Sequence, residues 1–160
     1  MPCYLFTFHA YRSWMPDHKR GFTRRKEGIV PKDEKLATAY EREAKEEPVT
    51  FFEDLQLVLI DELLNNADKQ SIRLHYVATD ATHVHVLVSW KEFRPWEKVR
   101  LSIKSSLTRC LNRKLKPRTW FAENASRKRV KDQRHFDYLV ATYLPKHGGW
   151  KRSEAKGLHK

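Results

Sequence analysis

A pair of histidines separated by one valine is the part of the sequence whose residue types most directly suggest chemistry. In the segment His83-Val84-His85-Val86-Leu87, imidazoles alternate with apolar side chains. Successive side chains of a strand point to opposite faces, so His83 and His85 would project from one face while the valines enter the other. Two imidazoles so placed lie close enough to hold one metal ion. The pattern also fits surface or hydrogen-bonded histidines, so both interpretations stay open at this point.

A tyrosine and a third histidine near the end of the chain could complete such a site. Tyr143 and His147 lie four residues apart, on one face if the helix predicted over 132–144 continues that far. A phenol with the ordinary pKa of about 10 is a weak nucleophile, which a divalent cation would help by polarising the phosphate under attack. Spacing alone favours the alternative, a half-buried core tyrosine. Pro145 disfavours helical geometry at the preceding residue, and a helix that stops there would separate Tyr143 from His147.

Tyr138 and His75 are further candidates near this chemistry. Tyr138 competes with Tyr143 as nucleophile, but it lies five residues earlier and would be rotated well away on an α-helix. Helical phase therefore favours Tyr143. His75, on the strand predicted beside the histidine pair, is the candidate to contact His83 or His85 and orient it.

The periodicity predicts an antiparallel sheet that carries the histidine pair. A strand is expected over 3–9, where side chains alternate between the two faces. Two β-rich runs, 72–78 and 83–90, are joined by the short polar segment 79–82 and predict a hairpin. Residues 120–121 are a candidate for a further strand.

Three amphipathic helices are predicted to cover this sheet. The first begins at Thr50 as its N-cap and ends near Asn65-Asn66. The second follows Pro95 and keeps apolar residues at helical spacing as far as Leu115. The third spans 132–144. Strands and helices that interleave with hairpin connections predict an α+β fold, an antiparallel sheet with helices packed on it.

The charge of the chain is basic and unevenly distributed. Lys plus Arg total 32 against 20 Asp plus Glu, a formal net charge of +12 at pH 7. Between residues 33 and 62 ten acids face three bases, so the other 130 residues carry 29 bases and ten acids, a net charge of +19. The densest stretch, 98–134, has 13 bases against two acids. A charge run is commonly a solvated face, but this density predicts binding to a phosphate backbone.

Several residues of the basic stretch are candidates to contact nucleic acid. Trp120 is the best candidate to stack on an unpaired base, a contact worth roughly 1–3 kcal/mol per base, although most tryptophans are core anchors. The DNA-binding candidates are Lys104, Arg109, Arg113, Trp120, Arg127, Lys128 and Arg129. No helix in this stretch combines a basic face with a broad apolar one, so a membrane surface is not the expected partner.

Length and composition indicate one cytoplasmic domain over 1–160. We expect a charged loop insertion over about 12–48, with a short helix at 33–46, and a basic C-terminal tail. Only two cysteines are present, far apart, which argues against a disulfide scaffold or a cysteine zinc site and fits a reducing compartment. No apolar run approaches the roughly 20 residues of a membrane helix, and no signal peptide is expected.

Taken together, these motifs resemble the single-tyrosine HUH transposases of small insertion sequences, and the chain is similar to the repeat-associated tyrosine transposases. Thr82-His83-Val84-His85-Val86-Leu87 looks like the family's Asn-His-hydrophobe-His segment, with Thr82 in place of the usual Asn. Tyr11-Arg12-Ser13-Trp14-Met15-Pro16-Asp17 with Arg20-Gly21-Phe22 is similar to an N-terminal loop of one branch of these proteins. The run from Tyr143 to Gly148 and the helix with Lys104 complete the resemblance.

The resemblance implies a ferredoxin-like α+β fold and a homodimer that cuts and rejoins single-stranded DNA at a hairpin-flanked site during DNA transposition and recombination. In the family a tyrosine attacks the phosphodiester, leaving a 5′-phosphotyrosine link and a free 3′-hydroxyl, with help from magnesium or manganese. Carried over, His83 and His85 match the metal pair and Tyr143 the nucleophile. His147 stands where the family often has Gln or Asn, and Lys104 resembles a lysine near the DNA. Such a protein would be nucleoid-associated when bound to DNA.

Two other functions stay open on the sequence. A domesticated relative would bind structured nucleic acid without cutting it, and its affinity would fall with salt. A metal hydrolase of small phosphoesters would use the same histidines but does not explain the net charge of +19 outside the acidic segment. Covalent capture conserves the phosphodiester energy, so the lack of a phosphate-cradling Gly-rich loop in the sequence does not count against the transposase hypothesis.

Overall fold

The computed structural model describes residues 1–13, 22–24, 28–30, 46–91, 93–123 and 125–160. The helix predicted at 33–46 lies outside the described residues except for its last one. Most of the segment between Tyr11 and Phe22 that carries the N-terminal resemblance is also outside them. Within the insertion, β2 (Phe22–Arg24) and β3 (Gly28–Val30) pair antiparallel as a two-stranded sheet.

A six-stranded antiparallel sheet forms the centre of the molecule, in the order β6-β1-β5-β4-β7-β8. The strands are β1 (Cys3–His9), β4 (Arg73–Thr79), β5 (His83–Ser89), β6 (Ser126–Arg129), β7 (Lys151–Ser153) and β8 (Gly157–His159). The predicted first strand and the predicted hairpin are confirmed. The strands β1, β4, β5 and β6 follow the β-α-β-β-α-β chain order with the spatial order fourth, first, third, second, which is the expected ferredoxin-like arrangement.

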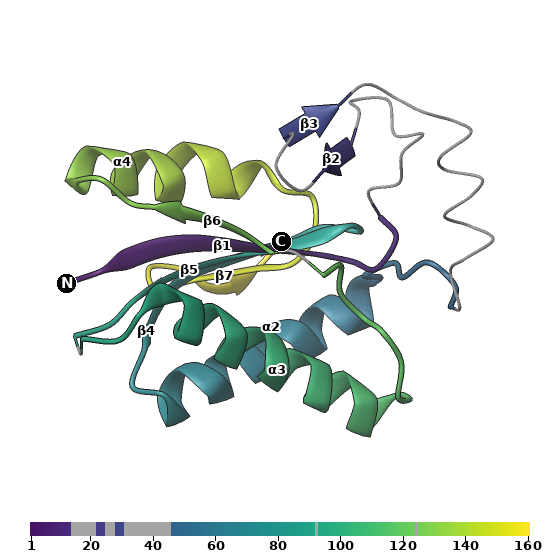
Figure 1. The fold of residues 1–160 in the computed structure, drawn as a ribbon. Coiled ribbons are helices and arrows are strands. Elements are labelled where there is room, and N and C mark those ends of the chain that lie inside the picture. The colour runs from purple at the N-terminus through teal and green to yellow at the C-terminus, as the bar shows by residue number, and fades with distance from the viewer. Residues whose placement is uncertain (14–21, 25–27, 31–45, 92, 124) are drawn as a thin grey trace.

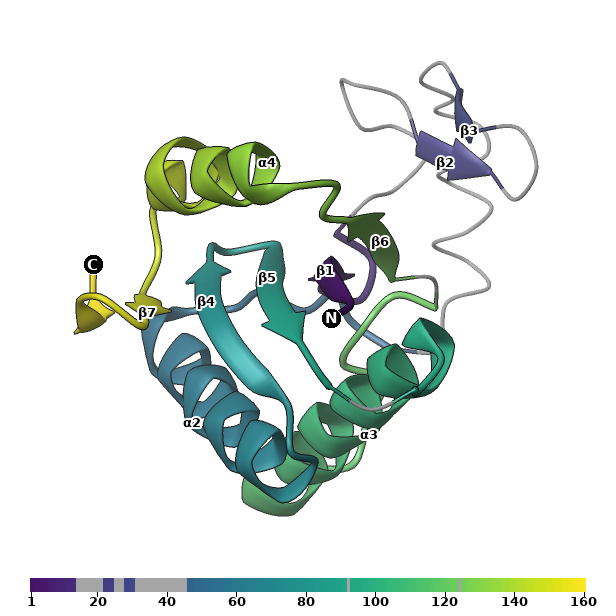
Figure 2. The ribbon, with the colours of Figure 1, turned by 90° about the vertical axis from the view of Figure 1, so that its left-hand side faces the viewer.

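Helices cover both faces of this sheet (Figures 1 and 2). On one face lie α2 (Glu53–Lys69) and α3 (Trp96–Lys114), and on the other lies α4 (Gln133–Tyr138) with the turns that follow it. The larger core lies under α2 and α3 and includes Phe6, Val84 and Val86, all completely buried. A smaller core under α4 contains Leu5, Tyr76, Ala78, Leu87, Leu139 and Leu144. None of the helices in the described part of the chain is long and apolar enough to cross a membrane.

The first helix is displaced from its predicted bounds. It begins at Glu53 with Phe52 as N-cap, and no side chain caps it, so Thr50 is not the N-cap. It ends at Lys69 rather than near Asn65-Asn66, because Asn66 is buried and its carbonyl oxygen accepts a hydrogen bond from the Gln70 N–H at 2.9 Å. Packing against the sheet outweighs the weak helix propensity of asparagine.

The second half of the chain contains strands that the periodicity did not reveal. The basic run Arg127-Lys128-Arg129 lies in β6, whereas Phe121 of the predicted 120–121 strand forms only an isolated bridge with Ala10. The C-terminal tail pairs with β4 through β7 and continues into β8. A charged strand at a sheet edge lacks the alternating apolar pattern that signals a half-buried strand.

The predicted third helix changes its winding before it ends. After α4, Leu139–Tyr143 form a π-helical turn in which the Leu144 N–H donates to the Leu139 carbonyl five residues earlier, and Leu144–Lys146 form a 3₁₀ turn. Asp132 caps the start, because its side chain accepts a hydrogen bond from the His135 N–H at 2.8 Å. Pro145 has no N–H to donate and cannot continue an α-helix, which accounts for the change just before it.

Gly149 attaches the segment after these turns to β4. Its N–H donates to the Thr79 carbonyl oxygen at 2.9 Å, and the Thr79 N–H donates to the Trp150 carbonyl oxygen at 3.1 Å. A Cβ at Gly149 would lie 2.5 Å from that Thr79 oxygen and 2.6 Å from Gln56 Oε1. The close approach therefore requires glycine, and it holds the chain two residues after His147 against the sheet.

Gly149→Ala is expected to lower the free energy of unfolding by about 1–3 kcal/mol, because backbone must move to admit the methyl group. Gly148→Ala is the matched control, since a Cβ there meets no heavy atom within 4 Å. Thermal melts of the two variants and the wild type measure the effect. Equal melting temperatures for the two variants would contradict this role of Gly149.

Candidate functional site

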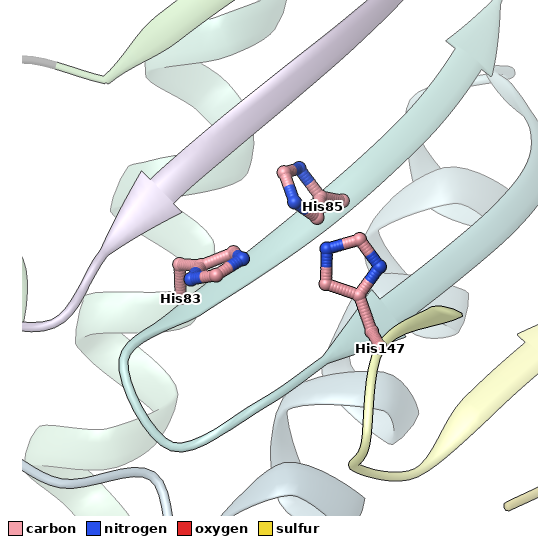
Figure 3. A group of neighbouring side chains, drawn as sticks. All are labelled: His83, His85 and His147. Carbon is pink, nitrogen blue, oxygen red and sulfur yellow. The ribbon is translucent and has the colours of Figure 1, made fainter. Parts of the chain in front are cut away.

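Three imidazoles converge on one point beside the α4 face of the sheet (Figure 3). His83 and His85 come from β5, and His147 follows the 3₁₀ turn. One ligand nitrogen of each lies within 4.8 Å of the other two, and the ring centroids are 4.4 to 5.4 Å apart. The histidine pair shares one face as strand geometry predicts, and His147 reaches it despite Pro145. The cluster can hold a divalent cation.

One imidazole nitrogen of His85, Nε2, is available to coordinate a metal ion. Its Nδ1 lies 2.7 Å from Thr7 Oγ1 of β1, and the side chain is only 4% exposed. Its Nε2 is buried, with no hydrogen-bond partner within the described residues. A buried polar atom without a partner costs roughly 1–3 kcal/mol, which coordination of a cation would offset. The donor set therefore fits a metal ion.

The other two imidazoles are also held through Nδ1. His83 Nδ1 lies 3.1 Å from Asp80 Oδ1 and 3.0 Å from Thr82 Oγ1, while His147 Nδ1 lies 3.0 Å from the Leu144 carbonyl oxygen. The Asp80 carboxylate also accepts hydrogen bonds from the backbone N–H groups of Thr82 and His83, which shapes the turn before β5. With Nδ1 engaged on every ring, Nε2 is the nitrogen left to bind a cation.

Burial keeps the two strand histidines neutral. It lowers the pKa of His83 to about 4 against the opposing effect of Asp80, and the nearby His147 and His9 make smaller contributions in the same direction as burial. Burial lowers the pKa of His85 to about 2, with further contributions from His83, His147 and His9. Neutral imidazole is the form that ligates metals, so both residues are ready to bind a cation at pH 7.

Tyr143 lies against the imidazole cluster. Its ring centroid is 5.5 Å from those of both His85 and His147. Burial, with smaller contributions from Tyr138 and Asp80, raises the pKa of the Tyr143 hydroxyl. The phenol is therefore protonated at neutral pH and would lose its proton only as it forms a new bond.

The π-helical turn gives Tyr138 a different position from the one expected. Rather than being rotated well away, Tyr138 lines a cavity of about 260 Å³ together with Tyr143, Thr7, Ser126 and Lys128. A turn that bonds residues five apart brings positions five apart onto one side. Tyr138 is half exposed, and of the two tyrosines Tyr143 is the one with ring contacts to His85 and His147.

The basic triplet of β6 is divided between the two faces of the sheet. Lys128 pairs with Leu5 and Ser126 with Thr7, which places both on the face of the imidazole cluster. Arg127 pairs with Phe6, and its guanidinium carbon lies 4.1 Å from the centroid of Trp96 on the opposite face. Arg129 pairs with Tyr4 and shares that opposite face.

The remaining DNA-binding candidates lie across the sheet from the cluster. Lys104, Arg109 and Arg113 are on α3, and Lys104 Nζ donates to the Ala122 and Glu123 carbonyl oxygens at 3.0 and 2.9 Å. Trp120 is 7% exposed and its Nε1–H donates to Asn112 Oδ1 at 2.9 Å, so its ring belongs to the core. DNA contact by these residues stays a prediction, and the structure does not bring them to the imidazoles.

His75 does not contact the histidine pair. The β4–β5 register shifts between Leu74 and Tyr76, and the His75 imidazole bonds to Ser89 at the opposite end of β5. The expected orienting role belongs instead to Thr7 and Asp80. Thr7 could not be found from sequence spacing, because it reaches His85 only through the β1–β5 pairing.

Comparison with known proteins shows the fold but no sequence relative. No family model and no curated protein matches the chain. A crystal structure described as a "putative transposase" from Deinococcus radiodurans R1 is 10% identical, with a TM-score of 0.52, over 92% of this chain and 93% of the other. A REP-associated tyrosine transposase bound to a REP hairpin is 9% identical, with a TM-score of 0.45, over 90% of this chain and 70% of the other. The protein therefore shares the α+β fold of the Deinococcus structure.

A transition ion is expected to bind the cluster more tightly than magnesium, because imidazole nitrogen suits Mn²⁺ and its neighbours while Mg²⁺ prefers oxygen. Calorimetric titration of the metal-free protein with MnCl₂ and MgCl₂ measures both affinities. His85→Ala should abolish Mn²⁺ binding, Thr7→Val should weaken it by about 10- to 100-fold, and His159→Ala on β8 serves as the control. Tighter Mg²⁺ binding would contradict this expectation.

The metal-free protein is expected to lose stability as the pH falls from 6.5 towards 4. In that range the unfolded chain takes up protons on His83 and His85, whose folded pKa values of about 4 and 2 keep them neutral. Each neutral imidazole contributes a slope of up to about 1.4 kcal/mol per pH unit. Urea unfolding at several pH values should give a shallower slope for His85→Gln, and an unchanged slope would contradict the assignment.

Proposed function

We propose that the protein is a metal-dependent tyrosine endonuclease of the transposase type, which cleaves and rejoins single-stranded or hairpin DNA. One observation carries the proposal. The ring of Tyr143 lies 5.5 Å from the rings of His85 and His147, and His85 Nε2 in that cluster is buried with no hydrogen-bond partner among the residues that the structure describes. A nucleophile next to a cation site is the arrangement that phosphodiester cleavage through a covalent intermediate needs.

In this proposal the Tyr143 hydroxyl oxygen attacks the scissile phosphorus. The bond between phosphorus and the 3′-oxygen breaks, which leaves a 5′-phosphotyrosine link, and the departing oxygen takes a proton to become a 3′-hydroxyl. The phenolic proton passes to solvent. Attack of a 3′-hydroxyl on the phosphotyrosine reverses the step and rejoins a strand, so no nucleotide cofactor is required.

The surroundings of the tyrosine support binding of the substrate backbone. His83, His85 and His147 would hold Mg²⁺ or Mn²⁺, which when bound polarises the scissile phosphate and gathers its charge. Thr7, Asp80 and the Leu144 carbonyl orient these rings. Lys128, in the cavity shared by the two tyrosines, supplies a positive charge for the neighbouring phosphate.

Further parts of the proposal concern the assembly and its partner. The net charge of +19 outside the acidic segment supports a polyanionic substrate. The shared fold with a protein described as a "putative transposase" supports DNA as that polyanion. A homodimer is part of the same proposal, by the family resemblance.

Tyr143→Phe is expected to abolish covalent attachment to DNA, because it removes the attacking oxygen and leaves the ring in place. Labelled hairpin DNA with single-stranded flanks is incubated with protein and Mn²⁺, and the adduct is detected on a denaturing gel. Tyr138→Phe is the matched control, since it removes the other hydroxyl of the same cavity and should preserve the adduct. Mapping the adduct by mass spectrometry identifies the tyrosine.

An adduct that survives Tyr143→Phe, or none from the wild type on a panel of hairpins, would overturn the endonuclease proposal. Binding measurements with the same DNA then test the alternative function, a nucleic-acid-binding protein that does not cleave. That function predicts salt-dependent binding that is unchanged in His83→Ala and Tyr143→Phe.

A further inference from the structure

A second group of chemically active side chains lies at the other end of the α4 face. Ser89 is the last residue of β5, four residues beyond His85, and its Oγ lies 2.7 Å from His75 Nε2. The His75 Nδ1 is hydrogen-bonded to Glu154 Oε1. Arg73 Nε donates to the other carboxylate oxygen, Glu154 Oε2, at 2.9 Å. A hydroxyl, an imidazole and a carboxylate therefore form one continuous chain.

The hydrogen bonds define the role of each group. An ionised carboxylate can only accept, so His75 Nδ1 carries the hydrogen, and in the neutral ring Nε2 then carries the lone pair. Burial raises the pKa of Glu154, but the hydrogen bonds from His75 and Arg73 outweigh it and hold the pKa below its usual range. His75 Nε2 then accepts the Ser89 hydroxyl proton, which is the relation between base and nucleophile in a serine hydrolase.

A cavity of about 460 Å³ gives this chain a place for a substrate. Ser89, His75 and Glu154 line it, together with Arg73. Its apolar lining comes from Met1, Val130 and Phe136, and its remaining charged and polar lining from Lys131, Asp132 and Gln133. The Phe136 ring also packs edge-on against His75, with centroids 5.0 Å apart, which restrains the imidazole.

We propose that Ser89, His75 and Glu154 form a second active site, which transfers the acyl group of small carboxylic esters to Ser89 and then to water. The Ser89 oxygen attacks the ester carbonyl carbon while His75 Nε2 takes its proton. The bond to the alcohol oxygen breaks, and the alcohol leaves with that proton. Water then cleaves the acyl-serine, releasing the acid and restoring the serine.

The cavity lining suits that substrate class. An apolar acyl group would pack against Phe136 and Val130, and Arg73 and Lys131 are the cations of the lining that could stabilise negative charge developing on the carbonyl oxygen. Cys3 also lines the cavity, but burial raises its pKa to about 11, so the protonated thiol does not compete with Ser89. The site shares no residue with the imidazole cluster.

The full-length protein, without DNA or metal, is treated with a fluorophosphonate probe, in which a serine oxygen displaces fluoride. We expect one probe per chain, located on Ser89 by peptide mass spectrometry, together with hydrolysis of p-nitrophenyl butyrate. Ser89→Ala should abolish both. Ser105→Ala on α3, across the sheet, is the matched control and should change neither.

Variants of the base and the carboxylate distinguish catalysis from a purely structural network. His75→Gln and Glu154→Gln should each slow labelling of Ser89 by about 100-fold or more. Far-UV circular dichroism and thermal melts check folding, and Glu154→Gln carries the test if His75→Gln does not fold. Absence of label on Ser89 in the folded wild type, or equal labelling rates in the folded variants, would overturn the proposal.

Discussion

The structure depends on one strand that must satisfy two different environments at once. Strand β5 lies in the interior of the sheet, and its alternate side chains face opposite layers. Val84, Val86 and Val88 are buried under α2 and α3, so that face excludes water and anchors the strand. The other face carries His83 and His85 under the shorter α4 segment. The register that buries the valines necessarily presents both imidazoles on one side.

Burying imidazoles in this way is costly unless their nitrogens find partners, and the rest of the α4 face supplies them. Thr7 comes from β1, Asp80 from the turn before β5, and the Leu144 carbonyl from the end of the π-helical turn. Each occupies Nδ1, so the lone pairs of the three Nε2 atoms are left for a cation. The neutral state that burial imposes on His83 and His85 is the state a metal requires.

The end of the chain completes both sites because it returns to the sheet. Pro145 prevents a continuous α-helix, and the π-helical turn before it sets Tyr143 against His85 while His147 follows. Gly149 then approaches Thr79 so closely that no side chain fits, and β7 adds to the edge of β4. Glu154, just after β7, thereby reaches His75 at the far end of the same face.

Sequence by itself determined the elements whose patterns are local: the first strand, the β4–β5 hairpin, the course of α3, and the shared face of His83 and His85. Period-two and helical spacing follow from backbone geometry alone, so they need no knowledge of neighbours. Tyr143 as a candidate nucleophile and the basic charge of the chain could also be predicted, because they follow from residue types and spacing along the sequence. The end of the first helix could not be predicted from the sequence, because burial of Asn66 outweighs the weak helix propensity of asparagine.

Only the tertiary structure decided which distant groups meet. The pairing of β1 with β5 brings Thr7 to His85, and the shift between Leu74 and Tyr76 accompanies the turn of His75 away from the pair towards Ser89. The alternation along β6 separates Lys128 from Arg127 and Arg129, although the three are adjacent in sequence. Such contacts depend on register and packing between segments far apart in the chain, which no local spacing encodes.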